Sequence, residues 1–220
     1  MSSPATAGPV LVRVVDDDTE LRMSIVFLAE SVGLEAEDYA SAADLLADLR
    51  PERPGCLVLD VRMPGMSGLA LQQELARRGM ELPVIFVTGH GDISMAVSAM
   101  KGGAFDFIEK PFKEQALLDA IERANRVSLA RRGRALRVDE LRRLHESLTE
   151  REREVAVLVA RGQSNKVIAR GLGISDRTVQ VHRGHVMEKM RAHSAAELAR
   201  ILIDLDPGLA GDALSPPSSS

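Results

Sequence analysis

Four apolar stretches of this sequence each end on side chains that can bind a metal ion or a phosphate. The residues that follow them are Asp16 and Asp17 after VLVRVV, Asp60 after CLVL, Thr88 after LPVIFV, and Lys110 after AFDFIE. In a parallel α/β sheet the carboxyl ends of the strands share one edge, and ligands bind in the crevice there. The sequence therefore predicts that these residues converge on one pocket.

The predicted pocket has the composition of a magnesium-dependent phosphoryl-transfer site. Its three acids supply the oxygen ligands that Mg²⁺ prefers, and a divalent cation would relieve their mutual repulsion. A carboxylate can accept a phosphoryl group as an aspartyl-phosphate, and this transfer depends mainly on charge neutralisation. Asp60 is the predicted nucleophile, while Lys110 and the Thr88 hydroxyl would hold phosphoryl oxygens.

Strands that alternate with helices are needed to place these side chains at one edge. The predicted strands cover residues 10–15, 34–39, 56–60, 82–88 and 104–109, and the predicted helices cover 18–33, 41–50, 68–79, 91–103 and 113–127. Five such repeats predict an α/β fold with a doubly wound, five-stranded parallel sheet and helices on both faces. Asp18 is expected to start the first helix, where any acid is favoured by the helix dipole.

Length and charge indicate two domains that differ in their balance of acidic and basic residues. A chain of 220 residues suits two small domains. Residues 1–121 hold 10 basic and 19 acidic groups, residues 122–143 hold 8 and 3, and residues 144–220 hold 10 and 10. The lone cysteine excludes an intrachain disulfide, and no apolar run is long enough for a membrane span. We expect a cytoplasmic protein that does not bind membranes.

A second, all-α unit follows a basic connector. Four helices are predicted there, starting after Thr149, Ser164, Ser175 and Ser194, because each of these residues can cap a helix. The expected order is a flexible start (1–8), the sheet domain (9–125), a basic and partly helical linker interrupted at Gly133 (126–144), the helical domain (145–205) and a disordered tail (206–220).

The third predicted helix of this unit has the spacing of a helix-turn-helix. Ala169, Gly173 and Val179 occupy the helix crossing, the turn and the apolar anchor. A stripe formed by Val179, His182, Val186 and Met190 should face the core, so we interpret His182 as structural rather than functional. The opposite face should enter the major groove of DNA.

The motifs VVDDD, LDVRMPGMSG, VTGHGD and DFIEKPF, in this order, make residues 9–125 resemble a CheY-like response-regulator receiver domain. The resemblance implies that a sensor histidine kinase phosphorylates Asp60. It also implies that Asp17, Asp60 and the Arg62 carbonyl bind Mg²⁺, with Asp16 acting through water.

Two further features of the receiver follow from the resemblance. The peptide bond between Lys110 and Pro111 should be cis. Phe107 should be the aromatic switch that turns inward when Thr88 moves toward the phosphoryl group, with ordinary strand packing as the alternative.

Residues 148–200 resemble the LuxR-type DNA-binding domain, which makes 175–190 the recognition helix. The expected DNA phosphate contacts are Lys166, Arg177, Thr178, Arg183 and Lys189. Gln180 and Val181 are the expected base readers. Gly184, where the family often has a long basic residue, either lets the helix approach more closely or leaves one base unread.

Together the two halves resemble the FixJ-like branch of the NarL/FixJ response regulators. The expected function is a phosphorylation-regulated transcription factor that dimerises and binds promoter DNA, with RNA polymerase as a further partner. Gly102 and Gly103 depart from the usual small-residue pair near the expected dimer surface. Two alternatives stay open: regulation without phosphorylation, and an aspartate-nucleophile phosphatase, although that class has a second acid where this chain has Arg62.

Overall fold

The computed structural model describes residues 10–50, 53–89 and 93–206. The chain divides into two compact units between Gly133 and Arg134. The predicted flexible start and the predicted tail lie outside the described residues, apart from Asp206, which caps the last helix.

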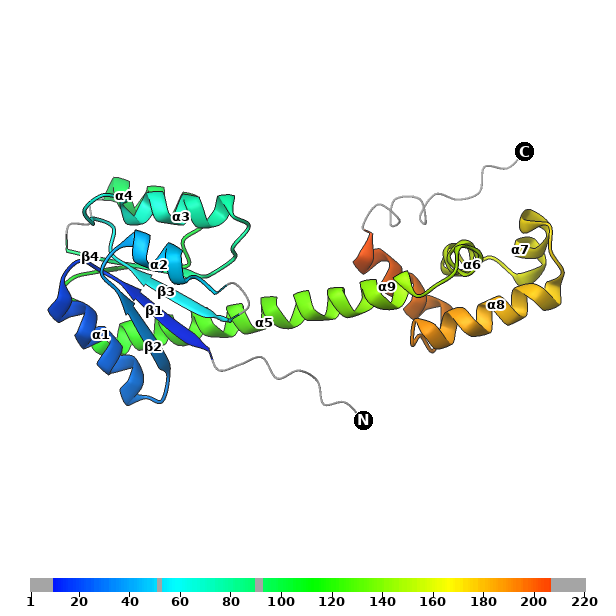
Figure 1. Cartoon of the computed structure of the whole chain (residues 1–220), viewed down its shortest axis with the longest axis horizontal. Helices are drawn as coiled ribbons and strands as arrows, with labels where there is room; N and C mark the ends of the chain where they lie inside the picture. Colours follow the sequence, from blue (N-terminus) through cyan, green and yellow to red (C-terminus); the bar gives the residue numbers. More distant parts are fainter. Residues whose placement is uncertain (1–9, 51–52, 90–92, 207–220) are drawn as a thin grey trace. The chain divides into compact units, whose positions relative to one another are not determined.

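The first unit contains the predicted five-stranded parallel sheet, in the order β2-β1-β3-β4-β5 (Figure 1). Its strands are β1 (Leu11–Val15), β2 (Glu35–Tyr39), β3 (Gly55–Leu59), β4 (Val84–Thr88) and β5 (Asp106–Glu109). Val15 pairs with Leu59, so Asp16 and Asp60 leave neighbouring strands at the same level. This is the point where the strand order reverses, as a doubly wound sheet requires for a binding crevice.

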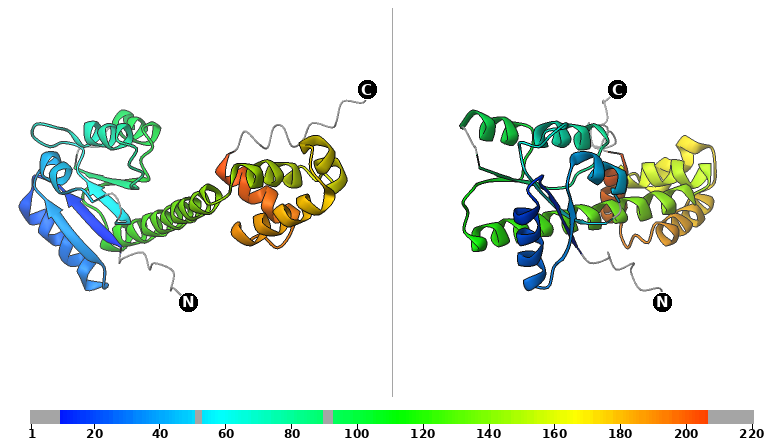
Figure 2. Two further views of the ribbon diagram at one scale, coloured as in Figure 1. Left: turned by 45° about the vertical axis from the view of Figure 1, so that its right-hand side comes forward. Right: turned by 60° about the vertical axis from the view of Figure 1, so that its left-hand side comes forward.

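Helices cover both faces of this sheet, as Figures 1 and 2 show. They are α1 (Thr19–Ser31), α2 (Ala42–Asp48), α3 (Gly68–Arg77), α4 (Ile93–Lys101) and α5 (Glu114–Glu146). One core joins α1 and α5 to Val12 and Val14, and the other joins α2, α3 and α4 to Val15. Because side chains alternate along β1, the strand contributes residues to two separate cores, one on each face of the sheet.

Helix α5 differs from the prediction because Gly133 does not interrupt it. The helix is continuous over 33 residues, so the expected partly helical linker is helical throughout. A glycine in a helix interior costs only about 1 kcal/mol relative to alanine, and the neighbouring arginines, alanines and leucines favour helix. Leu117 and Ile121 of α5 are buried in the first unit, and Leu141 is buried in the second.

The second unit contains the four predicted helices and the end of α5. They are α6 (Glu150–Ala160), α7 (Asn165–Leu172), α8 (Asp176–Lys189) and α9 (Ala195–Leu205). Thr149 caps α6 as predicted, and it forms a capping box with Glu152. Ser175 and Ser194 accept backbone hydrogen bonds as caps, whereas Ser164 occupies its cap position without a side-chain bond.

Candidate functional site

The carboxyl edge of the first sheet brings two of the predicted acids and the predicted lysine together. The Lys110 Nζ atom lies 2.8 Å from Oδ2 of Asp16 and 3.1 Å from Oδ1 of Asp60. The backbone N–H of Lys110 donates to the Thr88 carbonyl at 2.9 Å, which places Thr88 beside the lysine. Asp16, Asp60 and Thr88 are all buried. Four separate strand ends therefore form one site.

The loop after Asp60 holds its carboxylate by close backbone contacts. The Arg62 N–H donates to Oδ2 of Asp60 at 2.6 Å, and the Gly68 N–H donates to the Val61 carbonyl. A Cβ atom on Gly68 would lie 2.1 Å from the Asp60 carbonyl oxygen, so only glycine fits there. Gly65 has a φ of +76°, which favours glycine in the turn.

The carboxyl edge of the sheet has more buried negative charge than positive charge. Burial raises the pKa of Asp60, although the Lys110 ammonium and the Arg62 N–H offset part of this effect. Burial lowers the pKa of Lys110, but its hydrogen bonds to Asp16 and Asp60 outweigh burial and raise the pKa overall. One ammonium thus faces two buried carboxylates, whose oxygen atoms are the kind of ligand that a hard cation prefers.

The remaining predicted receiver residues lie around this centre. Asp17 and Arg62 are exposed, and no three acidic, histidine or cysteine side chains of the described residues are grouped closely enough to hold a metal ion. Phe107 packs against the core under α4, whereas Ile108 packs in the other core, because successive side chains of a strand point to opposite faces. The Lys110–Pro111 bond is cis. Asp18 caps α1, accepting from Glu20 and Leu21.

Arg22 also supports this site, although it was not among the residues predicted from the sequence. This arginine of α1 is buried, and it donates to the Asp16 carbonyl at 2.7 Å and to Oδ2 of Asp38 at 2.7 Å. The guanidinium therefore ties the acid-bearing end of β1 to β2. The available signal was a charged residue that directly follows the apolar Leu21 within the first predicted helix.

The predicted recognition helix, α8, has the two faces expected from its sequence. Val179, Val186 and Met190 are buried and His182 is half-buried. Most of the predicted DNA contacts lie outside the core: Lys166, Arg177, Gln180, Val181 and Gly184 are exposed, while Thr178 and Arg183 are half-buried. The Thr178 hydroxyl is 2.7 Å from that of Ser175, and Arg183 donates to Asn165 of α7 at 3.2 Å.

Lys189 is placed differently from the other predicted phosphate contacts. Its Nζ atom lies 2.6 Å from Oε2 of the buried Glu152 and 3.3 Å from the Ser147 carbonyl. His185 lies 3.5 Å from the other carboxylate oxygen. The Lys189 ammonium, with the Thr149 N–H, holds the pKa of Glu152 down at about 2. Lys189 therefore links α8 to α6 while its side chain stays 36% exposed, and local sequence could not reveal this contact.

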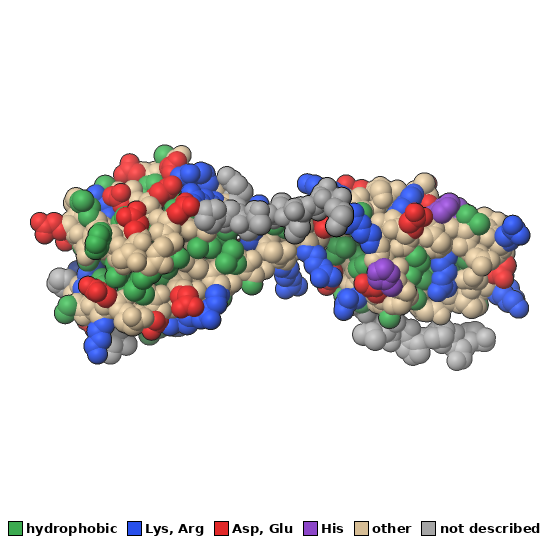
Figure 3. Space-filling view, turned by 90° about the horizontal axis from the view of Figure 1, so that it is seen from below, with side chains coloured by type: hydrophobic (Ala, Val, Ile, Leu, Met, Phe, Trp, Pro, Cys, Tyr) green, Lys and Arg blue, Asp and Glu red, His purple; other side chains and the backbone are tan. Residues whose placement is uncertain are grey.

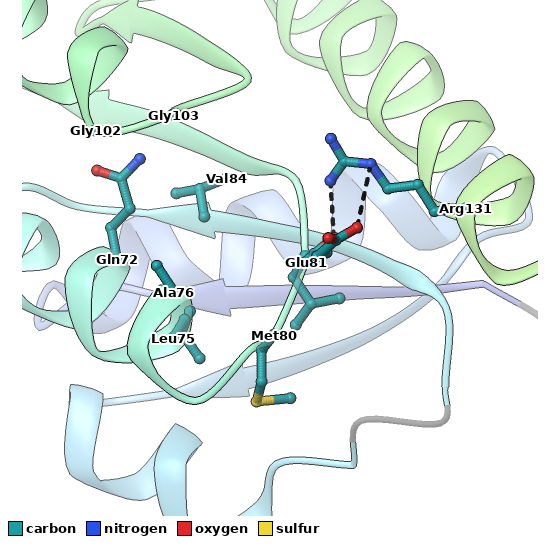
Figure 4. Close-up of a pocket in the computed structure, with 10 residues that line it drawn as sticks. Gln72, Leu75, Ala76, Met80, Glu81, Val84, Gly102, Gly103 and Arg131 are labelled. Atoms are coloured by element: carbon teal, nitrogen blue, oxygen red, sulfur yellow. Dashed lines mark hydrogen bonds and ion pairs between the residues drawn. The ribbon is translucent and has the colours of Figure 1, made fainter. Parts of the chain in front are cut away.

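Gly102 and Gly103, which depart from the usual small-residue pair, have definite structural roles at the end of α4. Gly103 has a φ of +87°, and the N–H of Ala104 reaches back to the Ala99 carbonyl, which ends the helix. A Cβ on Gly102 would lie 2.9 Å from Oε1 of Gln72. Gly102 and Gly103 line a hollow of about 230 Å³ together with Arg131, whose guanidinium donates to the Glu81 carbonyl at 3.0 Å. Figure 4 shows the residues around this hollow.

Comparison with known proteins agrees with this geometry over both units. Residues 12–122 match the family model of the response regulator receiver domain, and residues 146–202 match that of the luxR family of bacterial regulatory proteins. Nodulation protein W of Bradyrhizobium diazoefficiens is 50% identical over 191 residues, which are 87% of this chain and 84% of that protein. Transcriptional regulatory protein FixJ of Azorhizobium caulinodans is 46% identical over 196 residues, 87% of this chain and 91% of that protein.

A solved structure extends the similarity to three dimensions. The response regulator StyR is 47% identical and matches with a TM-score of 0.82, covering 89% of this chain and 98% of that one. Fold and site thus define a response-regulator transcription factor, in which a receiver domain is joined to a LuxR-type DNA-binding domain, and not a catalytic enzyme. The chain belongs to the NarL/FixJ family of response regulators.

None of the helices formed by the described residues is both long enough and apolar enough to cross a bilayer.

Proposed function

We propose that a sensor histidine kinase phosphorylates Asp60 and that this phosphorylation raises the affinity of the chain for promoter DNA. The observation that carries the proposal is the buried Asp60 carboxylate at the end of β3. Its Oδ1 atom lies 3.1 Å from the Lys110 ammonium. A phosphoryl group on this carboxylate adds negatively charged oxygen atoms that the Lys110 ammonium can bind.

Magnesium is the cofactor that we propose for this step. Asp17, Asp60 and the Arg62 carbonyl would hold it, with Asp16 acting through water, and it would neutralise charge on the phosphate when bound. The buried Asp16 and Asp60 and the exposed Asp17 beside them suit that role.

The chain's own residues link this site to a changed surface. In the structure Lys110 bridges Asp16 and Asp60. Phosphorylation gives Lys110 and the Thr88 hydroxyl new oxygens to bind, and movement of Thr88 frees space for Phe107, which is half-buried against the core next to α4. The surface formed by α4 and β5 would then favour receiver dimers.

DNA recognition is assigned to the exposed face of α8. Gln180 can form paired hydrogen bonds to adenine, and Val181, which is 50% exposed, can contact a thymine methyl group. A Cβ atom added to Gly184 would meet no other atom within 4 Å, so the helix backbone can approach a base edge there. Lys166, Arg177, Thr178 and Arg183 would contact phosphates around these bases.

The test is the affinity for promoter DNA with and without an acyl-phosphate donor. Fluorescence anisotropy should show tighter binding by the phosphorylated wild type and no response in Asp60→Asn, which keeps the shape of the side chain. Equal affinities of phosphorylated wild type and Asp60→Asn would contradict the proposal and favour phosphate-independent regulation. Labelling of Asp60 that requires Mg²⁺ would separately test the cofactor.

Other parts of the proposal concern partners and location. Two recognition helices in a dimer can bind half-sites about one helical turn of DNA apart. RNA polymerase is the expected downstream partner, and the cytoplasm is where the chain would meet both kinase domain and DNA. Release of a masked α8 is the alternative to dimerisation as the activating event.

A further inference from the structure

The middle of α5 is rich in positive charge and has no buried side chains. None of the residues between Ser128 and Leu141 is buried, and residues 122–143 contain eight arginines against three acids. Lys and Arg side chains are visible along this helix in Figure 3. Repulsion among these charges is unfavourable unless acids or a partner compensate it.

Acidic neighbours compensate only some of these arginines. Arg123, Arg126, Arg131 and Arg142 each have an acidic side chain within 4.0 Å. Within the described part of the chain, no ion pair or side-chain hydrogen bond is found for four others: Arg132, Arg134, Arg137 and Arg143. These four are the groups available to a partner.

Helical periodicity divides the four arginines between two opposite faces of α5. Arg134 and Arg137 precede the buried Leu141 by seven and four residues, so all three lie on one face. Arg132 and Arg143 lie nine residues before and two residues after Leu141, about half a turn away. Arg134 and Arg137 therefore continue the face that packs into the second unit, beyond the point where its core ends.

The same part of the second unit contains the end of the recognition helix. Arg191, just after α8, lies 2.7 Å from Glu140 of α5, and Lys189 donates to the Ser147 carbonyl at 3.3 Å. Arg137 is three residues before Glu140, roughly 4.5 Å along the helix axis, and Arg134 is one further turn away. Both guanidinium groups are thus within two turns of the point where α5 meets the end of α8.

We infer that Arg134 and Arg137 form a second phosphate-binding surface, which contacts double-stranded DNA beside the base pairs read by α8. The inference rests on the proposed DNA-binding role of that helix. Arginine suits it because its planar, permanently charged group pairs with phosphate oxygens through two hydrogen bonds. The contact is independent of base sequence, so it adds affinity and salt dependence rather than specificity.

An acidic protein surface is the competing partner for these arginines, since residues 1–121 carry 19 acidic and 10 basic groups. The position next to the end of α8 favours DNA. A protein contact would leave DNA affinity unchanged when the arginines are neutralised, which separates the two ideas.

The experiment measures binding of the full chain to a random-sequence 30-base-pair duplex over a range of salt concentrations. The test variant is Arg134→Gln with Arg137→Gln, and the matched control is Arg132→Gln with Arg143→Gln, which removes the same charge from the opposite face of α5. Glutamine preserves helix propensity, and circular dichroism checks the helix content. Arg177→Gln on α8 reports on the proposed recognition helix.

Two lost phosphate contacts should make the plot of log affinity against log salt less steep by about 1.8, because each contact contributes about 0.9. The affinity of the test variant should fall roughly tenfold at moderate salt, and the control should keep the wild-type slope. A wild-type slope in the test variant would overturn the inference, and so would equal losses in test and control variants. Failure of the wild type to bind the duplex would instead overturn the DNA-binding function itself, and this inference with it.

Discussion

Individual buried charges hold each of the two sites in place. In the receiver, Lys110 bridges Asp16 and Asp60, and Arg22 fixes the backbone of Asp16. In the DNA-binding unit, the Glu152 carboxylate, with its side chain only 4% exposed, binds Lys189 of α8. A buried charge is costly unless paired, so loss of one partner affects the geometry that the other maintains.

Gly68→Ala should destabilise the receiver by about 3 kcal/mol, because its Cβ would collide with the Asp60 carbonyl oxygen at 2.1 Å and the backbone cannot yield cheaply. Urea unfolding measures the loss. Gly102→Ala is the matched control: its nearest contact, at 2.9 Å, is the flexible end of Gln72. We expect it to cost less than about 1 kcal/mol. Similar losses in both variants would contradict the assigned role of Gly68.

Glu152→Gln should destabilise the second unit at neutral pH by about 2 kcal/mol, because it removes a charge-assisted hydrogen bond to Lys189. The folded-state pKa of Glu152 is about 2, below its ordinary value of 4.5. The ionised carboxylate therefore stabilises the fold fully above about pH 4.5, and this contribution is lost as the pH falls toward 2.

The measurement is the free energy of unfolding of wild type minus that of Glu152→Gln, from pH 7 down to pH 2. The difference cancels the titration of the other acids, and it should shrink only below about pH 4.5. A difference independent of pH over this range would show that the carboxylate charge is not what stabilises the unit.

At the scale of elements, α5 has a middle segment without buried side chains. It contributes Leu117 and Ile121 to one core and Leu141 to another, while its residues 129–140 are exposed or half-buried. Such a segment should open locally at lower cost than the helices of either core.

Gly133→Ala should stabilise this exposed segment by about 1 kcal/mol, since glycine has a much lower helix propensity than alanine. Hydrogen exchange of peptides covering residues 129–140 should slow several-fold. Ala135→Gly, two residues away, is the reverse test and should accelerate exchange in the same peptides by a similar factor. Exchange unchanged in both variants would mean that contacts of the segment, not helix propensity, control its opening.

At the scale of the whole molecule, the proposed activation requires a change at Asp60 to alter association of the chain. The receiver contains the phosphoryl site and the α4 and β5 surface, and the second unit contains α8. Dimerisation raises DNA affinity through effective concentration, because a second half-site is bound by a helix that is already held nearby.

Sedimentation should show that acyl phosphate with Mg²⁺ converts the wild type from monomer to dimer, whereas Asp60→Asn stays monomeric. Binding to DNA is measured in parallel on the same samples. Tighter DNA binding by a chain that remains monomeric would contradict dimerisation and support release of a masked recognition helix.

Much of the fold and of the receiver site could be predicted because it depends on local patterns. Alternating apolar runs and caps gave the five strands, the helices and their order, and the rules of parallel sheets then brought Asp16, Asp60, Thr88 and Lys110 to one edge. The spacing in α8 similarly separated its core stripe from its exposed face. Period and strand order are properties of short segments, so the sequence by itself determined them.

The tertiary structure decided the features that depend on contacts between distant residues. Lys189 and Glu152 meet across two helices, Arg22 reaches the end of β1, and Gly68 lies against the Asp60 carbonyl. Helix α5 continues through Gly133 because glycine costs a helix only about 1 kcal/mol relative to alanine. A cost this small does not allow the helix end to be predicted from one residue. The positions of the acids at the strand ends could be predicted from the sequence. Their ion pairs could not, because burial excludes water and makes each charge depend on whichever opposite charge the fold places next to it.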